Sequence, residues 1–506
     1  MSPMSPVDPV PAVPAVARLR SSTLHPDLFV GGRWVARATR LTVDDPSTGA
    51  VIGSVAAAGP QDVEDAVAAA RAAFERWAYT EPAERAALLT ALADAMSARE
   101  QEFASLITLE MGAPADFSLE VQTRLAIDVI RSYAALLESF EWSEPIPGGN
   151  STNQGVVVRE AAGVVAAITP WNYPLYQIAA KLGAALAAGC AVVLKPSGVA
   201  PLNAFLLAEC AETAGLPPGL LSVLSGSGRS VGEALARHPG IDVLSFTGST
   251  EVGTQVMRLA AGSVKRVGLE LGGKSAAVVL PGADLARAVA ETVDDVFANT
   301  GQTCTALTRL LVPADRYQEA VAAAVAAGAR HTLGDPSQPG PHLGPSASAS
   351  QRDTVLDHLR TAEQEGARTV LGGAGTPELP AHLDHLRAGY WVQPTILADV
   401  TAQMRIAREE VFGPVLCLMS YQDLSQALEL SNDSDYGLSG AVWAADREQA
   451  VAFARRMRTG RVQINGGGFN LHAPTGGYKL SGVGRELGRW GLEEFTEVKS
   501  LMLGGD

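Results

Sequence analysis

The feature that most restricts the fold of this chain is a regular alternation of short β-rich runs with Ala- and Leu-rich segments of helical length. It begins near Val164, where the β-rich runs are VVAAIT, AVVLK, LLSVLS and VLSFTG. It restarts at SAAVVL, continues through DLARAVAETVDDVFANT and LTRLLV, and ends near residue 465. Such alternation is typical of βαβ units that build a parallel sheet. The sequence therefore predicts an α/β protein whose two halves meet near Glu270 to Lys274, with a ligand crevice between them.

The part of the chain before this alternation has a different pattern. FVGGRWV and LTVDDPSTGAVIGSV read as short strands joined by Gly and Pro turns. Apolar residues then recur at steps of three and four through DVEDAVAAARAAFERW, which predicts a helix, and further helices are predicted from 83 to about 96 and through FASLITLEM. The turn-rich segment at 140–161 resembles a hairpin that is too small to have a core of its own.

Length and charge limit the classes of partner. At 506 residues with 47% hydrophobic residues, the chain can bury two or three cores. Its net charge of −15, without a long basic block, argues against nucleic acid and anionic membranes as partners. No apolar run approaches the roughly 18–20 residues that span a bilayer. We expect residues 1–22, which are rich in proline, to form a disordered tail rather than a signal peptide.

The four cysteines bear on compartment and on chemistry. They show no CxxC pair or regular spacing, so we expect reduced thiols, a cytoplasmic setting and no metal site such as zinc. Cysteines 190, 210 and 417 lie in apolar runs and are predicted to be structural. Cys304 lies in NTGQTCTALTR, among small uncharged residues between a predicted helix and a predicted strand. The alternatives for Cys304 are a buried inert thiol and a nucleophile that attacks a carbonyl.

Two further residues suit such chemistry. Glu270 precedes two glycines in LELGGKS at the predicted junction, where a carboxylate with a raised pKa can act as a general base; a surface glutamate before a turn is the alternative. Asn172 lies in ITPWNYP after a predicted strand, where a rigid amide can stabilise an oxyanion. An asparagine that bonds its own turn is the alternative there.

Two glycine-containing turns are candidates for binding phosphate. GSGRSVG at 226–232 has part of a dinucleotide-loop spacing, but its third glycine is one residue late, and a plain tight turn explains it equally well. In FTGSTEVG, Gly248 and Ser249 end a predicted strand just before a helix, and exposed amides there favour an anion. A simple helix cap remains the alternative.

Seven motifs together resemble a known family. PWNYP, KPSG, FTGST, ELGGKS, GQTC, EEVFGPV and GGYKLSGVGRELG occur in this order, within a resemblance that runs from about residue 28 to the C-terminus. The ordered set closely resembles the aldehyde dehydrogenase superfamily. The 34 residues from Glu270 to Cys304 also fit the spacing between base and nucleophile in that family.

The resemblance implies a role for individual residues. Cys304 matches the nucleophile, Glu270 the general base, Asn172 the side chain of the oxyanion hole, and Lys181 a lysine near the base. Within the cofactor set, Lys195 matches the residue that binds the adenosine ribose, Gly248 and Ser249 match the pyrophosphate turn, and Glu410 and Phe412 match the residues that hold the nicotinamide ribose. The full cofactor set is Ile168, Trp171, Lys195, Ser197, Gly198, Gly228, Phe246, Gly248, Ser249, Leu271, Glu410 and Phe412. The substrate set is Trp171, Tyr173, Tyr176, Thr303, Phe469 and Thr475.

The resemblance also implies an architecture and a reaction. Residues 23–139 and 162–270 would form a Rossmann-like cofactor domain, 271–477 a Rossmann-like catalytic domain, and 140–161 with 478–506 a small β arm that joins subunits into a homodimer or homotetramer. The implied reaction is NAD-dependent oxidation of an aldehyde to an acid, through a thiohemiacetal and a thioester on Cys304. Because Glu270 is present, hydrolysis is favoured over transfer of the acyl group to coenzyme A. A catalytically silent relative and a thiol hydrolase or esterase are two further hypotheses.

Two departures from the family pattern affect specificity. KPSG has Gly198 where the family usually has a glutamate that repels a 2′-phosphate, so we expect relaxed discrimination, with NADP accepted beside NAD or instead of it. Thr475 follows Pro474 where a phenylalanine is common, and this should widen or polarise the substrate funnel. With Trp171, Tyr173, Tyr176 and Phe469 retained, a medium-sized aromatic or aliphatic aldehyde is the expected substrate.

Overall fold

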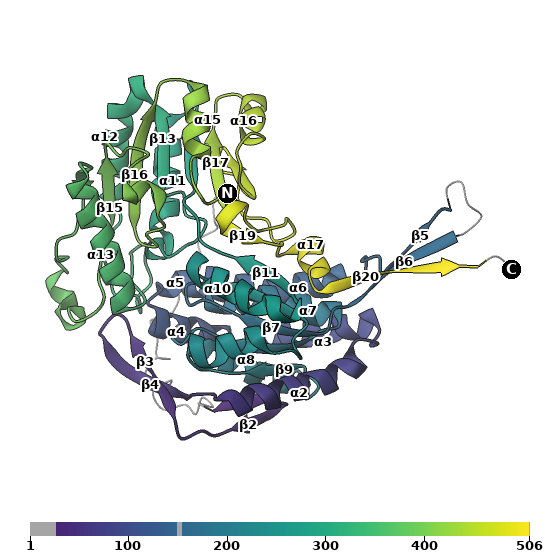
Figure 1. The fold of residues 1–506 in the computed structure, drawn as a ribbon. Coiled ribbons are helices and arrows are strands. Elements are labelled where there is room, and N and C mark those ends of the chain that lie inside the picture. Colours follow the sequence, from purple (N-terminus) through teal and green to yellow (C-terminus); the bar gives the residue numbers. More distant parts are fainter. Residues whose placement is uncertain (1–26, 149–153, 505–506) are drawn as a thin grey trace.

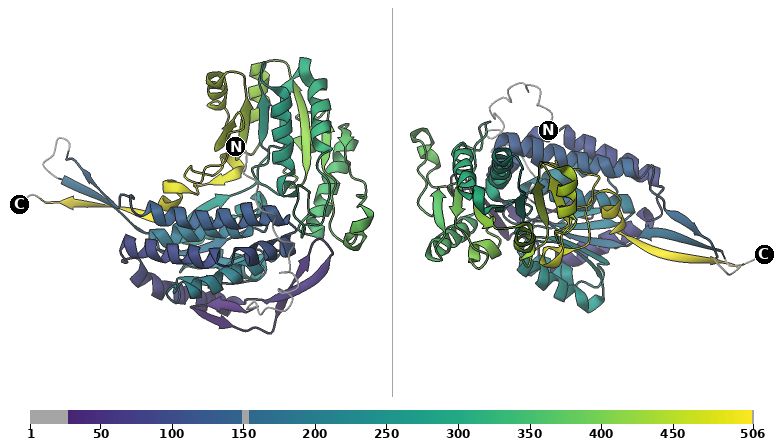
Figure 2. Two further views of the ribbon diagram at one scale, coloured as in Figure 1. Left: turned by 180° about the vertical axis from the view of Figure 1, so that it is seen from behind. Right: turned by 90° about the horizontal axis from the view of Figure 1, so that it is seen from above.

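The structure is a computed structural model of the chain that describes residues 27–148 and 154–504. The predicted tail at 1–22 lies outside the described residues. Two sheets with helices packed around them form two halves, and a β arm projects from one side (Figures 1 and 2). The prediction of an α/β fold with two parallel-rich sheets is confirmed.

The first half is built on an eight-stranded sheet. Its central strands are parallel, while β19, β1 and β2 add antiparallel edges. In β7 and β8 every residue is buried, as expected for strands covered on both faces. The strands in spatial order are β19 (Gly482–Val483), β11 (Arg266–Glu270), β10 (Val243–Thr247), β7 (Val164–Ile168), β8 (Ala191–Lys195), β9 (Leu221–Val223), β1 (Leu28–Val30) and β2 (Arg33–Val35).

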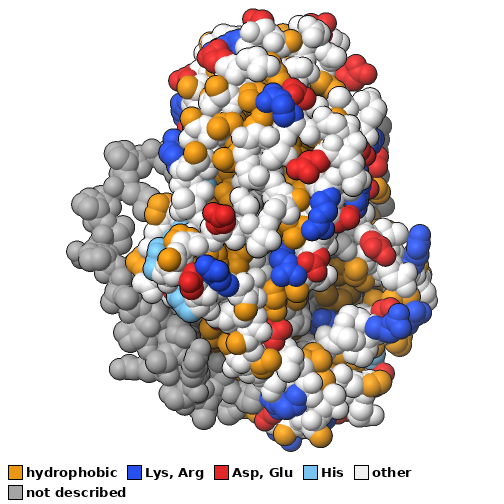
Figure 3. Space-filling view, turned by 90° about the vertical axis from the view of Figure 1, so that its left-hand side faces the viewer, with side chains coloured by type: hydrophobic (Ala, Val, Ile, Leu, Met, Phe, Trp, Pro, Cys, Tyr) orange, Lys and Arg blue, Asp and Glu red, His pale blue; other side chains and the backbone are white. Residues whose placement is uncertain are grey.

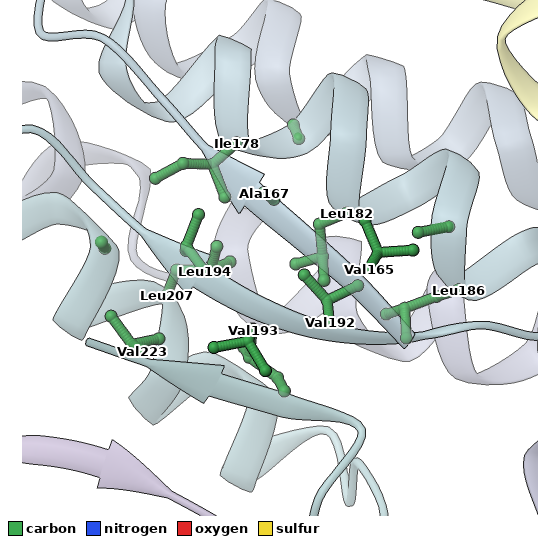
Figure 4. Close-up of a cluster of buried hydrophobic side chains, with 14 of the residues drawn as sticks. Val165, Ala167, Ile178, Leu182, Leu186, Val192, Val193, Leu194, Leu207 and Val223 are labelled. Carbon is green, nitrogen blue, oxygen red and sulfur yellow. The ribbon is translucent and has the colours of Figure 1, made fainter. Parts of the chain in front are cut away.

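Apolar helix faces enclose this sheet. Ile178, Leu182 and Leu186 follow one stripe of α7 (Pro174–Ala188) and pack against β7 and β8, as Figure 4 shows. The predicted helices are confirmed as α2 (Pro60–Trp77), α3 (Pro82–Ser97) and α4 (Glu100–Met111). The other helices of this half are α5 (Ala115–Phe117), α6 (Leu125–Leu136), α8 (Leu202–Thr213), α9 (Glu233–Arg237) and α10 (Thr250–Ala260).

The second half is built on a seven-stranded sheet, parallel except for its edge strand β14. Alternate residues of β12 face opposite helix layers: Ala276 and Val278 join one core cluster, and Ala277 and Val279 join another. The strands in spatial order are β14 (Arg368–Leu371), β15 (Thr395–Ala398), β16 (Val415–Tyr421), β13 (Arg309–Pro313), β12 (Ala276–Val279), β17 (Ser439–Trp443) and β18 (Arg461–Ile464). The helices are α11 (Leu285–Phe297), α12 (Tyr317–Gly328), α13 (Ala349–Gln364), α14 (Arg405–Arg408), α15 (Leu424–Asn432) and α16 (Arg447–Ala454).

The projecting arm is a three-stranded antiparallel sheet of β5 (Ser143–Ile146), β6 (Gln154–Ala161) and β20 (Thr496–Leu503) (Figure 1). The predicted arm segment 478–506 needs one correction. Within it, β19 pairs with β11 of the first sheet, and α17 (Gly488–Glu493) packs against α6 and α7. Of the part of this segment that the structure describes, only β20 pairs with the hairpin of β5 and β6, and its pairing with β6 begins at Thr496. A separate pair, β3 (Arg40–Asp45) and β4 (Ala50–Ala56), lies near the N-terminus.

The surface has mixed charge on the face drawn in Figure 3, where Lys and Arg side chains are interspersed with Asp and Glu side chains. Within residues 27–148 and 154–504, no helix has the length and apolar character needed to cross a membrane.

Candidate active site

The two sheets meet at a short segment between β11 and β12. Glu270 ends β11, and Ala276 begins β12 six residues later. Ser481 fixes this segment, because its carbonyl accepts a hydrogen bond from the Leu271 amide at 2.9 Å and its hydroxyl donates to the Gly272 carbonyl at 2.7 Å. The chain therefore passes from the first sheet to the second between Glu270 and Ala276.

Cys304 reaches this junction on a tightly constrained loop between α11 and β13. Asn299, Thr300 and Gly301 have φ values of 53°, 57° and 70°, so three successive residues are left-handed. Such backbone is costly for residues with a Cβ and is concentrated at functional sites. A Cβ at Gly301 would lie 2.0 Å from the carbonyl oxygen of Gly413, so only glycine fits. The Cys304 side chain is half-buried, whereas the other three cysteines are buried.

Asn172 lies beside this loop. It follows β7 and is 4% exposed, and its Nδ2 donates to the Gln302 carbonyl at 3.0 Å. The backbone carbonyl of Asn172 accepts hydrogen bonds from Gln122 Nε2 at 2.8 Å and Asn299 Nδ2 at 2.9 Å. An amide nitrogen has two N–H groups, so a second donor remains next to the cysteine loop. Asn172 is therefore a buried, fixed donor and does not simply cap its own turn.

Glu270 is 8% exposed at the end of β11. Burial and the nearby Glu486 carboxylate raise the pKa of Glu270 well above its usual value, while Lys181 and Arg485 oppose the rise. The loop after residue 473 lies against it, since a Cβ at Gly476 would be 2.8 Å from the Glu270 Oε1 atom. A carboxylate whose pKa is raised is a stronger base than an ordinary glutamate, which suits general-base catalysis.

Lys181 contacts a partner that the sequence did not single out. Its ammonium forms a buried ion pair with Glu486 and donates to the Thr247 hydroxyl at 2.6 Å. Glu486 lies 305 residues away in sequence, within GVGRELG. The charges of Lys181 and Glu486 both act on the Glu270 carboxyl group, since Lys181 lowers its pKa and Glu486 raises it. Thr475 lies beside Glu486, because the backbones of the two residues exchange two hydrogen bonds of 2.8 Å.

The Cys304 thiol is protonated in this environment. Burial and the Glu410 and Glu270 carboxylates raise its pKa to about 12, and the Arg461 charge opposes the rise. Attack by sulfur therefore requires that a base take up the thiol proton.

A row of aromatic rings leads away from the cysteine loop. Thr303, next to Cys304, shares a 2.8 Å hydrogen bond between its hydroxyl and that of Tyr173. The Tyr173 ring centroid is 6.3 Å from that of Tyr176, and Tyr176 is 6.3 Å from Phe469. Phe117 joins the row at 5.9 Å from Tyr173. Because Phe469 is 45% exposed, the row connects the surface with the thiol, and four predicted substrate residues lie along it.

The predicted cofactor residues gather at one edge of the first sheet. Ile168 pairs with Lys195 on one side and with Phe246 on the other, at the carboxyl ends of three parallel strands. Ser249 caps the next helix, accepting a hydrogen bond from the Val252 amide at 3.4 Å. Ligands of such sheets bind at this edge. Ser197, Gly198, Gly228, Gly248 and Leu271 follow strands of the same sheet at this edge.

Lys195 and Gly198 define the end of this edge. Lys195 is 5% exposed, its ammonium donates to the Pro196 carbonyl at 3.0 Å, and burial lowers its pKa to about 8. A Cβ at Gly198 would meet no atom within 4 Å. The edge therefore offers a buried cation beside open space.

Glu410, Phe412 and Trp171 lie where the second half faces this edge. Glu410 Oε1 accepts a hydrogen bond from the Gly273 amide at 3.0 Å, and burial raises the pKa of this carboxyl to about 7. Phe412 has a left-handed φ of 58°, and its ring meets that of Trp171 edge-on at 5.4 Å. The contact between Trp171 and Phe412 joins the two halves at this edge.

The geometry brings a thiol, an amide donor and a buried carboxyl group to one junction, beside an apolar path and a sheet edge suited to a nucleotide. This set can carry out acyl chemistry on a carbonyl carbon.

Comparisons with known proteins agree with this geometry. The profile of the aldehyde dehydrogenase family matches residues 34–501. A 3-succinoylsemialdehyde-pyridine dehydrogenase of Pseudomonas sp is 44% identical, with 94% of this chain and 98% of that protein covered. The geranial dehydrogenase of Castellaniella defragrans is 42% identical over 95% and 99% of the two chains. The crystal structure of a mutant of aldehyde dehydrogenase C from Pseudomonas syringae with NAD+ and octanal has a TM-score of 0.90 and 42% identity, with coverage of 94% and 96%.

Proposed function

The chain belongs to the aldehyde dehydrogenase family, and we propose that it oxidises an aldehyde to the carboxylic acid by covalent catalysis at Cys304. The observation that carries this proposal is the meeting of Cys304, Asn172 and Glu270 at the junction of the two sheets. The test is to follow reduced nicotinamide and acid product with hexanal and NAD+, without coenzyme A. Acid formed in step with reduced cofactor supports the proposal, and no turnover with any aldehyde counts against it.

The first step is attack by the Cys304 sulfur on the aldehyde carbon. The thiol proton must leave first, and water at the half-buried side chain can carry it away, so Glu270 stays ionised for the later step. The carbonyl oxygen becomes an oxyanion, which the free N–H of Asn172 and the backbone amide of Cys304 can stabilise. The product of this step is a thiohemiacetal.

When bound, NAD+ would supply the hydride acceptor, and loss of hydride from the thiohemiacetal carbon would leave a thioester on Cys304. Glu270 then takes a proton from water, and the resulting hydroxide attacks the thioester carbon. The carbon–sulfur bond breaks, the acid leaves and the thiol is regenerated. The proximity of Glu270 to the thiol supports hydrolysis over transfer to coenzyme A.

The residues present fit a nicotinamide dinucleotide. Lys195 offers a buried ammonium, Gly248 and Ser249 form a turn at a helix N-terminus, and Glu410 with Phe412 faces that edge from the other half. NAD+ is the cofactor named for the Pseudomonas syringae structure. We propose NAD as the cofactor, and NADP as a second one because of Gly198.

Gly198→Glu is expected to lower the ratio of kcat/KM with NADP to that with NAD by about tenfold or more, since a carboxylate there repels a 2′-phosphate. The position has open space and no left-handed φ, so the side chain fits without strain. Gly198→Gln is the matched control, with the same shape and no charge. The measurement is initial rates with both cofactors, and equal ratios in the two variants would refute this role for residue 198.

The pH dependence of kcat/KM is expected to report the Glu270 carboxyl group. Because its pKa is raised, the rate rises with pH through a midpoint well above 4.5. Glu486→Gln removes a neighbouring negative charge and leaves Lys181 unpaired, so the pKa of Glu270 falls and the midpoint moves down by about one unit.

Glu486→Gln also shows whether Glu270 or Glu410 sets the pH midpoint of kcat/KM. Glu410 also titrates near pH 7, but its pKa is set by burial, the Gly273 amide and Lys274 rather than by Glu486. Glu233→Gln is the control for the loss of one glutamate charge and should leave the midpoint unchanged, because among the described residues Glu233 pairs only with Arg237, one helical turn away. A midpoint that is the same in Glu486→Gln and wild type would show that Glu270 is not the titrating base.

We also propose a homodimer or homotetramer joined through the arm. The outer strand β20 exposes Val498 and Met502, which are 64% and 76% exposed, together with Leu501 and Leu503. An apolar strand of this kind supports burial against another subunit.

A further inference from the structure

Arg461 is a charged residue at the catalytic edge of the second sheet that the mechanism leaves unused. It begins β18 and pairs in register with Ser439 of β17. Ala276 pairs with Gly440 of β17 on one side and with Arg309 of β13 on the other. The first residues of these strands therefore share one edge, which is also the edge where the Cys304 loop enters β13.

The Arg461 guanidinium lies at the aromatic row. Its Cζ is 5.9 Å from the centre of the Phe469 ring, which in turn contacts Tyr176. Burial raises the pKa of the Cys304 thiol and of the Tyr173 hydroxyl, and the positive charge of Arg461 lowers both. The guanidinium is therefore within electrostatic reach of the nucleophile, on the path that leads to it.

No carboxylate balances this charge directly. Within residues 27–148 and 154–504, Arg461 forms no ion pair, and its buried Nε has no hydrogen-bond partner. Two acidic side chains of α11 have contacts of their own, although the Arg461 charge lowers the pKa of one of them, Asp295. Asp295 accepts a hydrogen bond from the Leu307 amide at 2.9 Å, and Glu291 pairs with Arg287 at 2.7 Å.

A buried guanidinium N–H without an acceptor is costly, and a planar guanidinium suits a carboxylate. The aromatic row supplies an apolar wall between this cation and the thiol. We propose that Arg461 binds a carboxylate at the far end of the substrate, so that the enzyme prefers aldehydes that carry a second, acidic group. This inference rests on the proposed aldehyde oxidation.

The test compares kcat/KM for 6-oxohexanoate with hexanal and for 4-carboxybenzaldehyde with benzaldehyde. Wild type should prefer the carboxylated member of at least one pair by tenfold or more. Arg461→Met should lower that preference by at least tenfold, and Arg461→Lys should restore part of it. Arg458→Met is the matched control, since Arg458 lies over the Tyr478 ring at 5.4 Å, and it should keep the preference. Equal rates within both wild-type pairs, or a preference that persists in Arg461→Met, overturns the inference.

Binding gives a readout that does not depend on turnover. Isothermal titration of Cys304→Ala should show tighter binding of the same carboxylated aldehyde than of its neutral counterpart, and Cys304→Ala with Arg461→Met should not. If wild type oxidises no aldehyde, the proposed function fails while this titration still decides the role of Arg461. Equal affinities in the two proteins overturn that role.

Discussion

Cys304→Ala is expected to lower kcat/KM for aldehyde oxidation by about 10⁴-fold or more, because no other group at the junction can form the carbon–sulfur bond. The side chain is half-buried on a loop fixed by three left-handed residues, so the substitution removes the sulfur without removing a core contact. The measurement is the rate of nicotinamide reduction at saturating aldehyde and cofactor.

Cys417→Ala is the matched control for the loss of a thiol in the same half of the molecule. Cys417 is buried in β16, and its sulfur donates to the Ile406 carbonyl at 3.7 Å. This variant is expected to retain its kcat/KM within a few fold. A Cys304→Ala protein that still turns over at a comparable rate would exclude thiol catalysis.

Glu270→Gln is expected to lower kcat by about 10²- to 10⁴-fold, which is the usual contribution of a general base. Glutamine keeps the shape of the side chain at the end of β11 but cannot take a proton from water. Hydrolysis of the thioester should therefore become the slow step. Single-turnover mixing should show rapid formation of reduced nicotinamide, up to one equivalent per subunit, followed by slow turnover.

A second glutamate separates this effect from a general loss of negative charge. Glu494 is one of the charges that raise the pKa of Glu270, and its Oε1 accepts a hydrogen bond from the Arg485 amide at 2.9 Å. Glu494→Gln should change kcat far less than Glu270→Gln. If Glu270→Gln retains wild-type kcat, another group must activate the water.

Much of the fold could be predicted because its signals are local. Fully buried strands such as β7 and β8 appear in the sequence as continuous apolar runs, and the stripe of α2 appears as a period of three to four residues. The place of β19 could not be predicted in this way. It has two residues, and its pairing with β11 depends on a contact between segments more than 200 residues apart.

The site shows the same division. Cys304, Glu270 and Asn172 could be found because each lies in a short motif with glycine or proline beside it. Glu486 lies in the motif GGYKLSGVGRELG, yet only the fold shows that its carboxylate pairs with Lys181. Arg461 lies in GRVQIN, outside every motif, and the one signal for it is a charge at the start of a β-rich run. Its place beside the aromatic row follows from strand order, which the sequence does not encode locally.

The central claim is that the substrate becomes a thioester on Cys304 that Glu270 helps to hydrolyse. The most direct test is peptide mass spectrometry of Glu270→Gln, quenched with acid during turnover of hexanal and NAD+. The account predicts a hexanoyl group on the peptide that contains Cys304, and none on the peptides that contain the other three cysteines. Acid product without an acylated Cys304 peptide, or an acyl group on a different residue, would contradict it.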